Sequence, residues 1–291
     1  MPWRGIVKAA LIGTAFATNS TLAAAACAGG SNPLTVLVLR AGVAFLTLQV
    51  LLARRGIPRR LPVPQRWQAI GLGVLFGSYS WAVLQAFALM PVALVVVTFY
   101  TYPLMVAGYA WWRGWERFSM ATGLAFMTAF AGIMLALDVF GVYPDPRGVA
   151  MVLASAVVVT VVLTLTPRVR GQGDSRPITL HMLGTACALF TFGLITTSEF
   201  ALPATALGWL GLLGAPVFYT WAVIALFEVL AIIGSFRMSL VMNVEPVAAV
   251  LLSFLVLGQE LRQSQLAGAA LVVAAVVLLE GARLHRARGQ A

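Results

Sequence analysis

Long apolar stretches, separated by short polar connections, run along almost the whole chain. A helix needs about 20 apolar residues to cross the hydrocarbon core of a bilayer. We therefore predict an all-α integral membrane protein with ten transmembrane helices, at residues 5–26, 33–53, 66–88, 92–112, 119–138, 147–167, 178–199, 207–231, 238–257 and 264–284. The boundary between the eighth and ninth helices has the faintest turn signal.

The same order of motifs occurs twice, at a spacing of about 143 residues. Residues 33–35 (Pro-Leu-Thr) return as 177–179 (Pro-Ile-Thr), residues 79–83 (Tyr-Ser-Trp-Ala-Val) return as 219–223 (Tyr-Thr-Trp-Ala-Val), and Pro103 is matched by Pro246. This predicts two five-helix repeats, residues 1–143 and 144–291. An odd number of crossings turns the second repeat upside down, and inverted repeats around a central cavity are typical of secondary transporters.

Composition and charge support a membrane protein. Hydrophobic residues make up 61% of the chain and charged residues 10%, with a mean hydropathy of +0.94, whereas soluble domains carry roughly 25% charged residues. The net charge of +10 is concentrated in alternate connections. Only Arg147 and Arg262 lie in the other connections, and Arg40 lies inside a span. The positive-inside rule then predicts that both termini are cytoplasmic, and a nucleic-acid partner is not expected.

Polar and aromatic side chains inside the predicted spans are the candidate site, because burying them in lipid is costly. Tyr79 and Tyr219 lie too deep for an aromatic belt at the membrane interface. The residues expected to enclose an apolar substrate group are Tyr79, Trp81, Tyr100, Tyr102, Tyr219 and Trp221. The residues expected to hydrogen-bond charged substrate ends are Asn19, Gln85, Asn243 and Glu245. Threonines in the first span have an alternative role, in which they cap backbone carbonyls.

Pro103 and Pro246 lie inside the fourth and ninth predicted spans at matched positions. Each removes a backbone donor and disturbs the preceding helical turn. Paired broken helices in two repeats point to a binding site and to hinges, so we predict that both prolines are hinges.

Two readings of Glu245 remain open from the sequence. It is either a contact for a substrate amine or a proton acceptor, or else it is a buried partner of Arg40. Arg40 itself is expected to be structural. Proton antiport and simple facilitated exchange are both compatible with one acid at depth.

Nothing in the sequence predicts a catalytic or metal site. Cys27 and Cys187 give no disulfide or metal pattern, and two histidines do not assemble a hydrolytic set. No cofactor is expected, and an integral-membrane enzyme is a remote alternative.

Residues 88–94 (Ala-Leu-Met-Pro-Val-Ala-Leu) through Tyr102-Pro103, followed by Gly114-Trp115-Glu116 and Gly123, resemble the EamA repeat of the drug/metabolite transporter superfamily. Arg40 and the second-half positions Pro246, Gly258, Glu260 and Gly268 fit the same pattern. In its aromatic, neutral lining the chain is similar to the YddG-type exporters of aromatic and neutral amino acids.

The resemblance implies a secondary transporter of the bacterial inner membrane that exports amino acids, aromatic and other bulky neutral ones, by alternating access. Small-molecule substrates and lipid would be its partners, and a monomer would suffice. The alternative is a multidrug or other small-metabolite exporter of the same superfamily.

Overall fold

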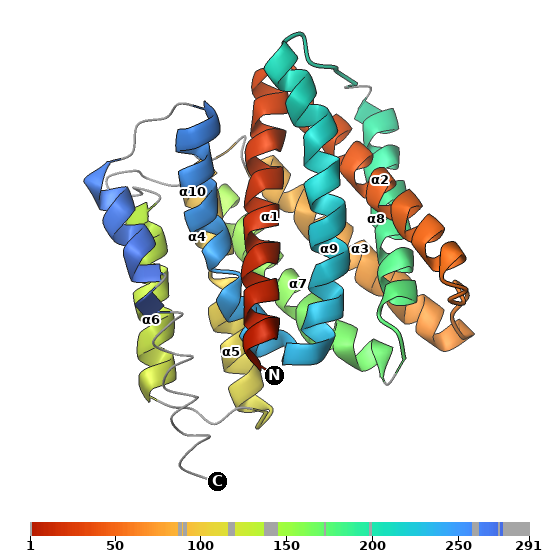
Figure 1. The fold of residues 1–291 in the computed structure, drawn as a ribbon, viewed down its shortest axis with the longest axis horizontal. Helices are drawn as coiled ribbons and strands as arrows, with labels where there is room; N and C mark the ends of the chain where they lie inside the picture. Colours follow the sequence, from red (N-terminus) through yellow and green to blue (C-terminus); the bar gives the residue numbers. More distant parts are fainter. Residues whose placement is uncertain are drawn as a thin grey trace.

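The structure is a computed structural model that describes residues 2–86, 89, 92–115, 120–136, 145–171, 173–197, 200–257, 262–272 and 274–275. Helices lying side by side make up the described chain (Figure 1). They are α1 (Pro2–Ala28), α2 (Pro33–Arg54), α3 (Val63–Ala86), α4 (Val92–Phe99), α5 (Tyr102–Trp112), α6 (Met120–Ala136), α7 (Pro146–Arg170), α8 (Arg176–Thr197), α9 (Ala206–Val241) and α10 (Val244–Leu257). Residues 263–272 are helical as well.

Helix starts follow from local capping chemistry, and one helix in each half shows the same device. The Asn32 side chain accepts a hydrogen bond from the Leu34 N–H before α2, with a proline at the first helical position. The Asp145 side chain accepts from the Arg147 N–H before α7, again with a proline following. Such caps satisfy N–H groups that have no partner inside the helix.

The fourth and ninth predicted spans are each broken in the middle. The first break falls at Tyr100–Thr101, between α4 and α5, and the second falls at Met242–Asn243, between α9 and α10. Both lie directly before the matched prolines, Pro103 and Pro246, which are buried. The helix break therefore lies where the missing proline donor weakens the turn.

The eighth and ninth spans meet inside α9. Gly234 has φ 80° and ψ 163°, a backbone conformation that interrupts the helix and that glycine adopts without steric cost. The chain turns here and resumes helical geometry at Ser235, so the ninth span begins three residues before the predicted position 238.

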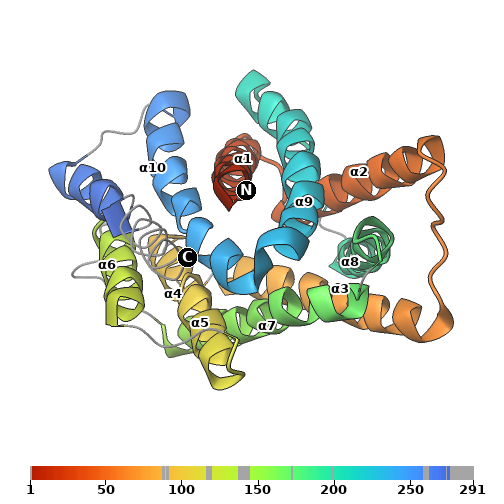
Figure 2. The same cartoon turned by 60° about the horizontal axis from the view of Figure 1, so that its bottom comes forward.

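Helices of the two halves pack against one another in matched pairs. α1 packs against α9 and α7 against α3, and in Figure 2 each pair lies side by side. α2 and its counterpart α8 run antiparallel. The Ala201 N–H, just after α8, donates to Thr35 Oγ1 at the start of α2, whereas a Cβ on Gly184 would touch the Phe45 ring further along. The two copies of this helix therefore have opposite directions.

Five described helices are long and apolar enough to cross a bilayer, namely Val7–Ala28, Pro33–Arg54, Pro146–Arg170, Arg176–Thr197 and Ala206–Ser239. Each half of a broken span is too short to cross the bilayer by itself. The apolar surface also suits lipid, since Leu46, Phe192, Ile195 and Ile232 are each more than 60% exposed. Soluble monomers rarely expose apolar surface so extensively.

Arginines gather at one end of the bundle. α2 ends and α3 begins there, and the Gln65 side chain donates to the Val169 carbonyl, which brings the end of α7 to the same place. We call this the basic end; it carries Arg54, Arg55, Arg66, Arg168, Arg170 and Arg176. The N-terminus of α1 lies at the same end in Figure 1.

Candidate functional site

Four tyrosines from different helices meet inside the bundle. Tyr79 comes from α3, Tyr100 from the break after α4, Tyr102 from the start of α5 and Tyr219 from α9. Tyr100, Tyr102 and Tyr219 are at most 5% exposed. We call these four residues the tyrosine cluster.

Ring contacts through Phe99 hold the first-repeat part of the cluster together. The Phe99 ring stacks on Tyr79, with centroids 5.8 Å apart and an interplanar angle of 21°. Its centroid lies 5.4 Å from that of Tyr102, and Tyr102 lies 5.7 Å from Tyr100. Aromatic pairs at these spacings are attractive beyond the area they bury. The break before Pro103 therefore presents three rings to the bundle interior.

Arg40, near the middle of α2, supplies a positive charge to this cluster. Its guanidinium carbon lies 4.7 Å from the centroid of the Tyr219 ring. Its Nε is buried and has no hydrogen-bond partner in the described structure. A buried charged donor without a partner is costly, so this atom is available to an acceptor that enters the cluster.

Glu245 supplies the negative charge, from the first turn of α10 directly after the second break. Its carboxyl group lies close enough to the Tyr100 hydroxyl and to the charge of Arg40 for both to act on it electrostatically. Within the described residues, however, no contact ion pair of 4.0 Å or less joins Arg40 to Glu245. Beside the tyrosine cluster, therefore, a guanidinium and a carboxyl group lie near each other without a contact ion pair.

The two asparagines of the predicted site are both buried. Asn243 lies in the second break and is 2% exposed. Asn19 is also 2% exposed. With its amide oriented to suit both neighbours, Asn19 donates to the Ala215 carbonyl of α9 and accepts from the Ser20 N–H. Asn19 therefore joins α1 to α9, and this contact already uses both ends of its amide.

Three predicted site residues do not lie in the cluster. Trp221 is 51% exposed, and Gln85, at the end of α3, is also exposed. The Trp81 ring packs against α8, where a Cβ on Gly193 would overlap it. The reason is helical geometry, because two residues rotate a helix by about 200°, so the tryptophan of each Tyr-x-Trp motif faces away from its tyrosine. These three residues therefore lie apart from the tyrosine cluster, and their role as substrate contacts stays a prediction.

Comparison with known families identifies the chain. The model of the EamA-like transporter family matches residues 3–137 and again residues 146–280. The chain belongs to the EamA-like transporter family. This EamA-family chain is therefore a membrane transporter of the drug/metabolite transporter superfamily.

Further comparisons concern curated proteins and solved structures. No curated protein matches this EamA transporter. It is similar to a solved structure described only as the crystal structure of a protein, with a TM-score of 0.72 and 21% sequence identity over 93% of this chain and 96% of that one. At that identity, the likeness supports the shared fold alone.

Sequence reasoning missed several residues of the cluster in this EamA transporter. Arg40 was expected to be structural, although a charged residue inside an apolar span is itself a functional signal. Phe99 and Phe16 were not chosen as site residues, because single phenylalanines in apolar helices are typical of ordinary packing. Phe16 packs edge to face with Tyr219, with centroids 6.2 Å apart. The repeat markers Glu116 and Glu260 lie outside the described residues.

Proposed function

We propose that this EamA transporter carries zwitterionic amino acids with bulky apolar or aromatic side chains, and that it exports them from the bacterial cytoplasm across the inner membrane. Arg40 binds the substrate carboxylate, Glu245 binds the ammonium group, and the tyrosine cluster encloses the side chain. The transporter crosses the membrane ten times as two inverted five-helix repeats, with its basic end and both termini in the cytoplasm.

The observation that carries this proposal is the separation of the two charges. The Arg40 guanidinium, with a free buried donor, and the Glu245 carboxyl group, beside Tyr100, lie in one aromatic cluster without forming an ion pair, within the described residues. A zwitterion supplies an anion to the first and a cation to the second. Charge-assisted hydrogen bonds of this kind contribute about 1.5–3 kcal/mol each.

Alternating access is supported by the closed state of the cluster and by the paired helix breaks. Three of the tyrosines are almost fully buried, so a substrate reaches them only after helices move. The breaks before Pro103 and Pro246 provide half-helices that can tilt while the rest of the bundle stays packed. Their hinge role is part of the proposal.

A lipophilic cation is the second candidate substrate, because Glu245 offers a carboxylate. Arg40 argues against it, since its positive charge acts on the same carboxylate and would repel a second cation. Anionic metabolites are disfavoured by Glu245 for the converse reason. Amino acids satisfy both groups at once.

The test is counterflow of labelled L-phenylalanine in proteoliposomes that contain only the purified protein. Bulky neutral amino acids are expected to compete with the label. Dyes, polyamines and nucleotides are expected to leave the flux unchanged. If no amino acid competes at millimolar concentration, the proposal is wrong.

A further inference from the structure

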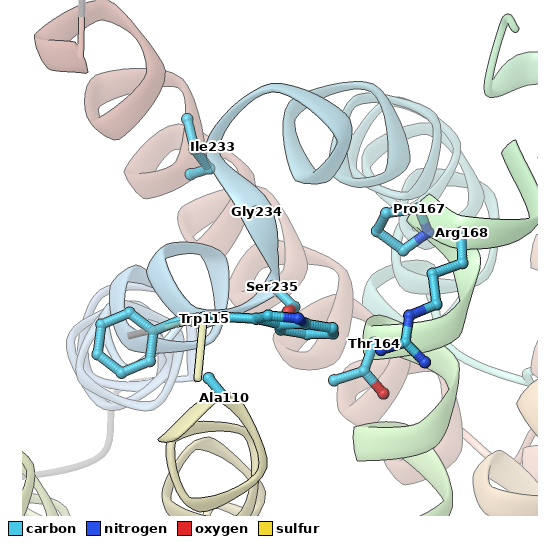
Figure 3. Close-up of a pocket in the computed structure, with 9 residues that line it drawn as sticks. Ala110, Trp115, Thr164, Pro167, Arg168, Ile233, Gly234 and Ser235 are labelled. Carbon is cyan, nitrogen blue, oxygen red and sulfur yellow. The ribbon is translucent and has the colours of Figure 1, made fainter. Parts of the chain in front are cut away.

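A second pocket opens at the basic end, away from the tyrosine cluster. It has a volume of about 290 Å³ and lies between the ends of α5 and α7 and the kink of α9 (Figure 3). The lining side chains that matter here are Trp115, Thr164, Arg168, Ser235 and Phe236. We call it the entry pocket.

Arg168 gives the entry pocket an available positive charge. Its guanidinium carbon lies 4.7 Å from the centroid of the Trp115 ring and 5.9 Å from that of Tyr109. Both ion pairs found among the described residues involve Arg176 instead, and no acidic side chain is among the pocket's described lining. Because ring stacking leaves the guanidinium N–H groups free in its plane, Arg168 can still bind a carboxylate bidentately.

The rest of the entry pocket combines apolar rings with a hydroxyl. Trp115 and Phe236 provide flat apolar surface, and Ser235 provides a hydroxyl group. In Figure 3 the Trp115 ring and the Arg168 side chain, which comes from α7, point toward each other. Small-molecule sites are typically apolar pockets in which a small number of polar groups converge.

The entry pocket lies about one helical turn from the tyrosine cluster. Thr164, in its lining, donates to the Thr160 carbonyl on α7 at 2.7 Å. The Thr160 hydroxyl, which donates to the Ala156 carbonyl at 2.8 Å, lies 3.4 Å from the Tyr102 carbonyl. One turn of helix rises 5.4 Å, so a molecule in the entry pocket is separated from the cluster by a thin layer of side chains.

The kink residue links the two sites mechanically. Gly234 lines the entry pocket, and no heavy atom lies within 4 Å of the position that a Cβ would take. The short helical segment from Ser235 to Val241 leads from the pocket to the second break, directly before Glu245. Movement at Gly234 therefore changes the entry pocket and the position of Glu245 together.

We propose that the entry pocket is a second binding site for the transported molecules, in which Arg168 binds the carboxylate and Trp115 and Phe236 contact the side chain before the substrate passes to the tyrosine cluster. This inference rests on the proposed amino-acid function. The entry pocket selects carboxylates with an apolar or aromatic group, and the cluster then adds the requirement for an ammonium.

The test is the KM of L-phenylalanine, measured separately from each side of oriented proteoliposomes. Arg168→Gln is expected to raise the KM at the basic end about tenfold, which corresponds to about 1.4 kcal/mol, and to leave the KM from the other side within twofold. Arg168→Lys keeps the charge and is expected to recover part of the loss. Arg66→Gln, an exposed arginine at the same end but outside the pocket, is the matched control and should leave both values unchanged.

A labelling measurement tests occupancy directly. In a background with Cys27→Ser and Cys187→Ser, Ser235→Cys is expected to react with a water-soluble thiol reagent from the basic end. L-Phenylalanine should slow that reaction, and Arg168→Gln should abolish the protection.

The outcomes separate this inference from the proposed function. If the wild-type protein neither binds nor transports any amino acid, the proposed function fails and this inference fails with it. If transport is intact but Arg168→Gln leaves the KM unchanged on both sides, or raises it equally on both sides, the proposed role of the entry pocket is wrong and the proposed function stands. If the effect of Arg168→Gln on the KM depends on the anionic lipid content of the liposomes, Arg168 binds lipid headgroups instead, and the inference is overturned.

Discussion

Tyr219 and Trp221 are two residues apart on α9 but lie in opposite environments. Tyr219 is 3% exposed and lies beneath the Arg40 guanidinium, whereas Trp221 is 51% exposed on the outer surface of the bundle. A motif read along the sequence treats the two rings as a pair. A helix separates them, and only the tyrosine can take part in the site.

This difference supplies a matched pair of variants. Tyr219→Leu removes the ring against which Arg40 stacks and is expected to raise the KM for L-phenylalanine about tenfold, since cation–π and aromatic contacts together contribute about 1–2 kcal/mol. Trp221→Leu should leave the KM within twofold. Uptake kinetics in proteoliposomes measure both. Equal effects of the two substitutions would mean that Tyr219 acts only through packing.

Asp174 and Arg176 form a charged pair at the start of α8. The Arg176 guanidinium, which hydrogen-bonds to the Asp174 side chain, holds the pKa of that carboxyl below its usual range. A depressed pKa means that the pair stabilises the fold above the unfolded-state pKa of about 3.9, and that this stabilisation is lost as the pH falls through the folded-state pKa.

Replacement of Asp174 by Asn is therefore expected to lower the unfolding temperature at pH 7 but not well below pH 4. The effect is small, below about 1 kcal/mol, because the pair is partly exposed and screened by solvent. Thermal unfolding in detergent at a series of pH values measures it. A destabilisation of the same size at all pH values would show that the charge of Asp174 contributes nothing.

At the scale of helices, the sequence predicted the elements well. Run length and polar punctuation located the helices to within a few residues, because lipid allows few alternatives to an uninterrupted apolar helix. The breaks before Pro103 and Pro246 followed from the chemistry of proline. A turn between the eighth and ninth spans was predicted within residues 232–237, but its position at Gly234 was not, since a glycine between Ile233 and Ser235 is compatible with either a helix or a turn.

The site was predicted only in part, because periodicity alone does not say which face of a helix is buried. The four tyrosines and Glu245 were chosen from their depth and residue type, and they do lie together. The contact between Arg40 and Tyr219 could be recognised only from the fold, since the two residues belong to different repeats. Trp81 and Trp221 were chosen because each belongs to the repeated Tyr-x-Trp motif, but helical rotation turns each tryptophan away from its tyrosine.

Glycine contacts between α1 and α9 supply a prediction about stability. A Cβ on Gly211 of α9 would overlap the Leu22 carbonyl of α1 and lie 2.7 Å from the Ala26 nitrogen. Gly211→Ala is therefore expected to lower the free energy of unfolding by about 1–3 kcal/mol, as overpacking does.

The matched control is Gly108→Ala in α5, where no heavy atom lies within 4 Å of the added Cβ. It should be neutral or stabilise the protein by up to about 1 kcal/mol, because alanine favours the helix. Thermal melting of both variants in detergent is the measurement. Similar melting temperatures would mean that α1 and α9 can move apart at little cost.

At the scale of the whole molecule, the site is assembled by both repeats. Tyr79, Tyr100 and Tyr102 come from the first half together with Arg40, and Tyr219 and Glu245 come from the second. Neither repeat alone carries both an aromatic wall and the two charges. Movement of one repeat against the other would therefore separate Arg40 from Glu245 and release a substrate bound between them. In the proposed transport cycle, this movement would couple substrate binding to opening.

The most direct measurement is equilibrium binding of three ligands to the purified protein and to two variants, Arg40→Gln and Glu245→Gln. The ligands are L-phenylalanine, phenylpropanoate, which lacks the ammonium, and phenethylamine, which lacks the carboxylate. The wild-type protein should bind L-phenylalanine about tenfold or more tightly than either analogue. In Arg40→Gln, L-phenylalanine should bind no more tightly than phenethylamine. In Glu245→Gln, L-phenylalanine should bind no more tightly than phenylpropanoate. Equal losses for all three ligands in both variants would contradict the account.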